Sequence, residues 1–171
     1  MRDPQTAVTP ASFSVVADSA DGTEAVGQAW GRVLGGGEVL LLGGDLGAGK
    51  TTLVRGIARG LEVPGGVKSP TFVIHLRYQG RLVLDHVDLY RVSGAADVAE
   101  LGLEDLFSPD SVCVVEWGER LGQTAPPHAV RVQFTEPDPA TRRITVVGDR
   151  QVVERLARAV GAGLDDPRGA A

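Results

Sequence analysis

One eight-residue segment constrains the fold of this chain more than any other. Residues 44–51 read Gly-Asp-Leu-Gly-Ala-Gly-Lys-Thr and match the phosphate-binding pattern G-x-x-x-x-G-K-[ST] without a gap or substitution. An apolar run at 39–42 predicts a buried strand before the segment, and apolar residues at helical spacing follow it at 52–58. Glycines let successive N–H groups converge on an anion, and the start of a helix adds partial positive charge. The segment therefore predicts a phosphate-binding loop between a strand and a helix.

The residue types within this loop predict separate tasks. Lys50 can reach the β- and γ-phosphates of a nucleoside triphosphate, and the Thr51 hydroxyl can ligate Mg²⁺. The remaining expected nucleotide-binding residues are Asp45, Leu46, Gly47, Ala48, Gly49 and Thr52. A glycine-rich turn that binds nothing is the alternative, and the coincidence of pattern and strand–loop–helix context disfavours it. We therefore expect a nucleoside triphosphate and Mg²⁺ at this loop.

Composition and charge limit the classes of protein to which the chain can belong. Its 171 residues are 43% hydrophobic and 23% charged, as in a soluble globular domain. A net charge of −5 argues against strong binding of nucleic acid by this chain alone. No apolar run approaches the length of a membrane span, and residues 1–5 lack the apolar segment of a signal peptide. We expect a cytoplasmic protein without a membrane anchor.

Hydrophobic periodicity divides the rest of the chain into strands and helices. Strands are expected at residues 12–16, 39–42, 71–78, 81–88, 112–115, 129–135 and 142–148. Helices are expected at 22–34, from the loop to residue 60, at 95–107 and at 149–160. The apolar face of the first helix is expected to comprise Ala25, Val26, Ala29, Trp30, Val33 and Leu34.

These elements predict a three-layer α/β sandwich, with a mixed sheet of the P-loop NTPase type flanked by helices. There is no internal repeat and no linker long enough to divide the chain. We expect a single P-loop domain over residues 1–171, in which 1–10 and 165–171 are disordered tails.

Three carboxylates at predicted strand ends could hold the metal or place an attacking water. Asp85 follows an apolar run, Asp88 comes three residues later, and Glu116 ends the run at 112–115. Since Asp85 and Asp88 are separated by an odd number of positions, they are predicted to point to opposite faces of a strand. Pattern alone does not rank the three acids, and each could instead be a solvated or capping residue.

The histidines and the single cysteine do not indicate a metal centre. His75, His86 and His128 lie far apart and lack Cys or His neighbours at the spacing of a zinc site. His86 could orient a neighbouring side chain, although an ordinary strand histidine is the favoured interpretation. Cys113 lies in an apolar run and is expected to be a small core residue rather than a nucleophile.

Taken together, the motifs resemble the small bacterial TsaE-type ATPases of tRNA threonylcarbamoyladenosine biosynthesis. The loop is followed in the same order by Lys-Ser-Pro-Thr-Phe at 68–72, His-Val-Asp-Leu-Tyr-Arg at 86–91, Glu-Leu-Gly-Leu at 100–103 and Val-Glu-Trp at 115–117. The resemblance covers about residues 19–122. The loop alone occurs in many families, whereas this ordered set is far more specific.

The resemblance implies roles that spacing could not decide. It implies that Glu116 ligates Mg²⁺ together with Thr51, and that Asp88 is the second acid near the nucleotide, while Asp85 has no counterpart. It implies that Ser69 and Thr71 belong to a switch-like loop near the γ-phosphate, which makes Lys50, Thr71, Asp88 and Glu116 the expected catalytic residues.

The resemblance also implies a function and partners. It implies slow, partner-dependent hydrolysis of ATP with Mg²⁺, in complex with a tRNA-modifying ligase subunit and its paralogous scaffold subunit. The modified base would be the adenosine at position 37 of tRNA. This chain departs from the family at Val87, where an aromatic residue is usual, and corresponds loosely in its ten-residue amino-terminal extension and carboxy-terminal helix. The adenine pocket, which the family builds partly from the segment before and within the first helix, is left undefined.

Two other functions share the phosphate-binding loop. A small-molecule kinase would need a lid with several arginines, and here only Arg91 lies in a motif near the expected site. A nucleotide-binding switch that never hydrolyses is the non-enzymatic alternative. A GTPase is disfavoured, because its guanine-reading motif needs asparagine and this chain has none.

Overall fold

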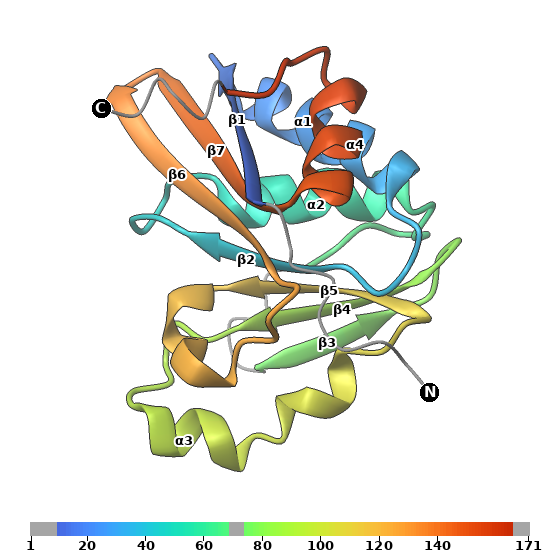
Figure 1. Ribbon diagram of the computed structural model, residues 1–171, viewed down its shortest axis with the longest axis vertical. Coiled ribbons are helices and arrows are strands. Elements are labelled where there is room, and N and C mark those ends of the chain that lie inside the picture. Colours follow the sequence, from blue (N-terminus) through green and yellow to red (C-terminus); the bar gives the residue numbers. More distant parts are fainter. Residues whose placement is uncertain (1–9, 69–73, 166–171) are drawn as a thin grey trace.

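Seven strands form one mixed sheet, in the order β1-β7-β6-β2-β5-β4-β3 (Figure 1). The computed structural model describes residues 10–68 and 74–165. The four central strands are parallel: β2 (Val39–Gly43), β4 (Val83–Asp88), β5 (Ser111–Glu116) and β6 (Val130–Asp138). The outer strands pair antiparallel with their neighbours: β1 (Pro10–Ala17), β7 (Thr141–Asp149) and β3 (His75–Tyr78). The expected mixed α/β sheet is confirmed.

Helices lie on both faces of this sheet (Figure 1). The larger core lies on the face covered by α1 (Ala20–Val33), α2 (Lys50–Gly60) and α4 (Arg150–Ala159). The smaller core lies under α3 (Ala95–Glu100) and two 3₁₀ helices, η1 (Leu103–Leu106) and η2 (Gly118–Thr124). This second layer packs on β2, β4 and β5, whereas the same face of β1, β7 and β6 carries exposed side chains such as Val16, Arg131 and Val147. The sandwich therefore has one complete and one partial helical layer.

Helices α1 and α2 approach so closely that their contact is made of glycines. A Cβ atom on Gly27 would lie 2.3 Å from the carbonyl oxygen of Leu53, and one on Gly56 would lie 2.1 Å from that of Glu24. Gly31 and Gly60 meet in the same way one turn further along. Because no side chain separates the two backbones, α1 holds α2, and with it the loop from which α2 starts.

Several expectations about local structure need correction. The helix expected at 95–107 ends at Glu100, because Gly102 has a φ of 61° and separates α3 from η1. Ala25, expected on the buried face of α1, is exposed, and Gly27 and Gly31 are buried in its place. Pro10 and Asp165, both expected to belong to disordered tails, are part of the described fold: Pro10 pairs with Asp149. The Asp165 N–H likewise donates to the Ser12 carbonyl oxygen at 2.8 Å.

Side chains cap two of the helices. The Ser19 hydroxyl caps α1 by accepting the Gly22 N–H, and the Asp149 carboxylate caps α4 by accepting the N–H groups of Gln151 and Val152. Cys113 is buried, and burial raises the pKa of its thiol to about 12, as suits a core residue. No helix in the described ranges is long and apolar enough to cross a membrane.

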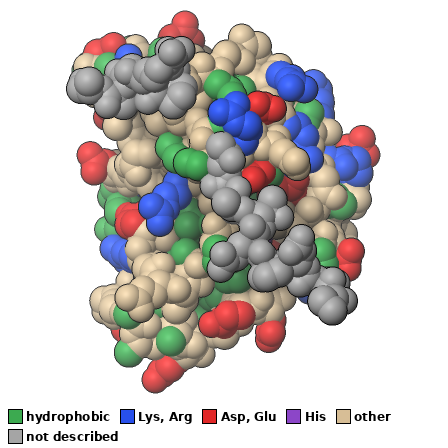
Figure 2. All heavy atoms as spheres, in the orientation of Figure 1, with side chains coloured by type: hydrophobic (Ala, Val, Ile, Leu, Met, Phe, Trp, Pro, Cys, Tyr) green, Lys and Arg blue, Asp and Glu red, His purple; other side chains and the backbone are tan. Residues whose placement is uncertain are grey.

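The surface has mixed charge on the face shown in Figure 2. Lys and Arg side chains gather over α1 and α4, at the upper right of the view, and acidic side chains are scattered over the remainder. Basic residues of α4 are paired with acids, Arg155 with Glu38 and Arg150 with Glu154. These ion pairs reduce the positive charge that this area presents.

Candidate nucleotide and metal site

The phosphate-binding loop connects the end of β2 with the start of α2, as the sequence predicts. Gly44, Gly47 and Gly49 have φ values of 137°, 80° and 108°, which L-residues with side chains rarely adopt. Helix α2 begins at Lys50, and no side chain of the described residues caps its first turn. Its leading N–H groups are therefore available to an anion, and they carry the positive end of the helix dipole. This geometry suits a phosphate group.

Lys50 lies folded over the loop. Its Nζ atom donates to the carbonyl oxygens of Gly44 at 2.5 Å and Asp45 at 2.8 Å, and it lies 4.2 Å from the centre of the Trp117 ring. The side chain is buried, and burial lowers the pKa of its ammonium group against the opposing effect of Glu116 and other nearby acids. The loop thus holds a desolvated cation at its centre.

Thr51, in the first turn of α2, meets Glu116 at the end of β5. Glu116 ends β5, which pairs with β2, and its side chain is 4% exposed. The Thr51 hydroxyl lies 2.9 and 3.0 Å from the two carboxylate oxygens of Glu116. A hydroxyl and a carboxylate are oxygen ligands of the kind that Mg²⁺ uses beside phosphates. The two residues expected to share a metal ion are therefore in direct contact.

Asp88 lies at the end of β4, opposite Glu116 in the strand pairing. One of its carboxylate oxygens accepts the Tyr90 N–H at 2.9 Å. Burial raises the pKa of Asp88, and the nearby negative charge of Glu116 adds to that effect. The strand order thus brings the expected second acid to the same edge of the sheet as the loop.

Asp85 lies on the other face of β4. In the alternation along this strand, Leu84 belongs to the larger core and Val87 to the smaller, so Asp85 and Asp88 face opposite sides as their odd spacing predicts. Asp85 is fully buried and accepts hydrogen bonds from His75 and Arg77 of β3. Burial opposes its ionisation, but these two partners together lower the pKa of the carboxyl. The contacts of Asp85 therefore tie β3 to β4, away from the loop.

A cluster of two aromatic rings and an arginine lies beside the loop, and it was not predicted from the sequence. The Trp117 ring lies 5.3 Å from the Tyr90 ring, and the Arg120 guanidinium lies 5.1 Å from Trp117. Arg120 also donates to the carbonyl oxygens of Leu89, Tyr90 and Val92, which fixes the chain after β4. Tyr90 and Trp117 belong to the motifs at 86–91 and 115–117, but neither motif predicts that these rings contact Lys50 and Arg120.

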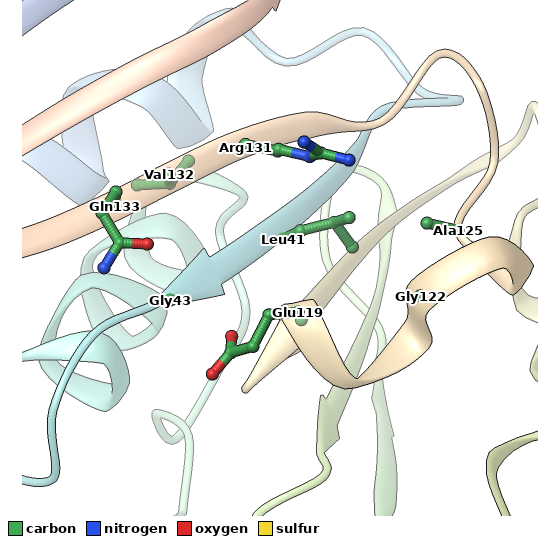
Figure 3. Close-up of a pocket in the computed structure, with 9 residues that line it drawn as sticks. Leu41, Gly43, Glu119, Gly122, Ala125, Arg131, Val132 and Gln133 are labelled. Carbon is green, nitrogen blue, oxygen red and sulfur yellow. The ribbon is translucent and has the colours of Figure 1, made fainter. Parts of the chain in front are cut away.

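A pocket of about 340 Å³ opens beside the loop, on the face opposite α2 (Figure 3). Leu41 and Gly43 of β2 line it together with residues of η2 and β6. Its polar groups are the carboxylate of Glu119, the guanidinium of Arg131 and the amide of Gln133 (Figure 3). The sequence gives one indication of this pocket, the alternation of buried and exposed residues along β6.

Most of the other expected site residues lie in the loop or at the start of α2, and two of them fall outside the described residues. Asp45, Leu46 and Gly47 form the exposed tip of the loop, where Leu46 is 71% exposed, whereas Ala48 is buried. Thr52 lies in the first turn of α2 and is partly buried. Ser69 and Thr71 lie outside the described residues, so their expected roles stay predictions.

Comparisons with known proteins confirm the resemblance. A family model described as "Threonylcarbamoyl adenosine biosynthesis protein TsaE" matches residues 17–144. The tRNA threonylcarbamoyladenosine biosynthesis protein TsaE of Treponema pallidum is 39% identical over 77% of this chain and 97% of its own length. The Bacillus subtilis protein of the same name is 39% identical over 71% of this chain and 79% of its own length.

A solved structure agrees with the fold. The crystal structure of Bacillus subtilis YdiB superposes with a TM-score of 0.73 at 28% sequence identity, and covers 90% of this chain and 96% of that one. The likeness extends beyond the loop to the whole arrangement of the sheet and helices.

Proposed function

Because this chain belongs to the TsaE family of threonylcarbamoyl adenosine biosynthesis proteins, we propose that it is a Mg²⁺-dependent ATPase supporting that modification of tRNA. The modified base in this proposal is the adenosine at position 37. The observation that carries the ATPase assignment is the contact of Thr51 with both carboxylate oxygens of Glu116, at the foot of a loop that holds Lys50. A glycine-rich turn without a ligand would not need these three groups together.

In this proposal the residues of the loop and of the neighbouring strand ends have different roles. The N–H groups at the start of α2 and the Lys50 ammonium contact the phosphates, and Lys50 leaves the Gly44 and Asp45 carbonyl oxygens to do so. Thr51 and Glu116 would hold Mg²⁺, which when bound neutralises charge on the phosphate oxygens. Asp88, beside Glu116 at the next strand end, orients the attacking water.

Partners complete the proposed function. A chain of net charge −5 with a mixed-charge surface is not expected to hold tRNA by itself. We therefore assign tRNA binding to the ligase subunit and its scaffold subunit, with hydrolysis by this chain resetting their complex. Hydrolysis is expected to be slow alone and faster in the mixture.

The test is phosphate release from ATP, with and without Mg²⁺, for the chain alone and mixed with the ligase and scaffold subunits. Lys50→Ala and Glu116→Gln are expected to lose most of the Mg²⁺-dependent rate, and tRNA modification by the mixture should fall with it. Undiminished hydrolysis by Lys50→Ala would overturn the assignment. Transfer of phosphate to a small-molecule acceptor in place of water would establish the kinase alternative.

A further inference from the structure

Glu116 has a second polar contact besides Thr51, and it comes from inside the sheet. His86 of β4 is fully buried, and its Nε2 atom lies 2.8 Å from Glu116 Oε1. That oxygen is one of the two that the Thr51 hydroxyl contacts. In the alternation along β4, His86 shares the face of Leu84 and Asp88, which is the face of the phosphate-binding loop. Among the described residues, the hydrogen bond to Glu116 is the contact that links the His86 ring to the site.

The buried surroundings of the ring determine which nitrogen carries the proton. The Nδ1 atom is buried and has no hydrogen-bond partner in the part of the chain that the structure describes. A neutral ring protonated on Nε2 donates to Glu116 and leaves only an acceptor unpartnered at Nδ1. A ring protonated on Nδ1 would bury an unbonded donor and turn a lone pair toward the carboxylate. The geometry thus assigns the proton to Nε2.

We propose that His86 is a positioning residue for Glu116: its Nε2–H fixes the carboxylate so that both oxygens face Thr51 and the proposed metal site. The inference rests on the proposed function, since it needs Glu116 as a metal ligand. In this proposal His86 acts on the carboxylate of Glu116 and is not itself a ligand of the metal or the nucleotide. Hydrogen bonds to a ligating carboxylate set its orientation, and their loss commonly reduces metal affinity ten- to a hundredfold.

The chain offers a matched control. His75 makes the same kind of contact, with Nε2 2.7 Å from Asp85 Oδ1, but on the opposite face of β4 and away from the loop. Removing the His75 contact perturbs the sheet without touching Glu116. A purely structural role of His86 would give the two histidine variants similar effects at the metal site.

The experiment measures the affinity of Mn²⁺, the probe for Mg²⁺, for the full chain bound to a non-hydrolysable ATP analogue, by the electron paramagnetic resonance of free Mn²⁺. His86→Phe removes the donor and is expected to weaken Mn²⁺ about ten- to a hundredfold. His86→Gln keeps an N–H donor near the Nε2 position and should stay within a few fold of the wild type. His75→Phe should leave the affinity unchanged. Circular dichroism establishes that each variant is folded.

A double-mutant cycle distinguishes the possible failures. If His86 acts through Glu116, then His86→Phe adds little to the loss already caused by Glu116→Gln. Additive losses, or wild-type Mn²⁺ affinity in folded His86→Phe, would overturn the positioning role. Should His86→Phe fail to fold, Mn²⁺ binding by His86→Gln and His86→Asn decides, because only Gln can keep the donor near Nε2. Wild-type affinity in Glu116→Gln would instead refute the proposed metal ligand itself.

Discussion

At the scale of single residues, Lys50 is the loop residue whose change has the clearest expected effect. Lys50→Ala removes the only cation in residues 44–51, and a charge-assisted hydrogen bond contributes about 1.5–3 kcal/mol. ATP affinity should therefore fall about ten- to a hundredfold. Calorimetric titration with a non-hydrolysable analogue checks this, with Arg55→Ala on the exposed side of α2 as the control for loss of charge. Equal affinities for Lys50→Ala and Arg55→Ala would contradict the role of Lys50.

The sequence alone identifies the residues of the loop, but it does not identify the side chains from other strands that act with them. Lys50 and Thr51 could be assigned because a phosphate site needs its groups in one short, contiguous segment. Glu116 and Asp88 needed a family resemblance, because their distance from the loop depends on the order of strands in the sheet. The sequence allowed that His86 could orient a neighbouring side chain, but it did not identify Glu116, since 30 positions separate the two residues.

At the scale of elements, the glycine contact between α1 and α2 should limit stability. Gly27→Ala places a methyl group 2.3 Å from the Leu53 carbonyl oxygen, so the helices must separate. We expect the free energy of unfolding to fall by about 1–3 kcal/mol, despite the better helix propensity of alanine. Denaturant titration measures this, and the control is Gly163→Ala, whose added Cβ has no atom of the described residues within 4 Å. Equal stability of the two variants would show that the helices can part freely.

The hairpin of β3 and β4 should carry a pH dependence. Asp85→Asn keeps the shape but removes the charge that His75 and Arg77 face, which should cost about 1–3 kcal/mol at neutral pH. Because the pKa of Asp85 is lowered in the folded state, its contribution is complete above the unfolded pKa of about 3.9 and is lost as pH falls through the folded value. The difference in stability between wild type and variant should thus persist to about pH 4 and shrink below it. Thermal unfolding across pH 2–7 tests this, and a difference that does not vary with pH would refute it.

Hydrophobic periodicity predicted the main helices and strands, but it did not predict where α3 ends or how α1 and α2 pack together. Apolar spacing predicted α4, because one face of that helix, with Val153, Leu156 and Ala157 buried, meets the core. The same spacing continued through Gly102, where a positive φ ends the helix. Gly27 and Gly56 look like weak points of two helices in the sequence, and their packing value appears only when both helices are in place.

At the scale of the whole molecule, the proposed ligand should stabilise the fold. A ligand that binds only the folded state adds about 2.7 kcal/mol at a concentration one hundred times its Kd. For a domain of this size, that corresponds to a rise in Tm of about 5–10 °C. Scanning fluorimetry with Mg²⁺ and a non-hydrolysable ATP analogue should show this rise in the wild type and a much smaller one in Lys50→Ala. Equal rises in both proteins would mean that the analogue binds elsewhere.

The position of β5 has a consequence for biosynthesis. This strand lies between β2 and β4 although the ribosome delivers it after both, and β6 joins the other side of β2 later still. A nascent chain that carries residues 44–51 but has not yet reached residue 116 possesses the loop without its carboxylate partner. Non-local pairing of this kind forms late, after the cost of closing a long loop has been met. On the proposed function, chains interrupted before β5 lack the Glu116 ligand of the metal, so they are expected to capture nucleotide with Mg²⁺ more weakly than chains that contain β5.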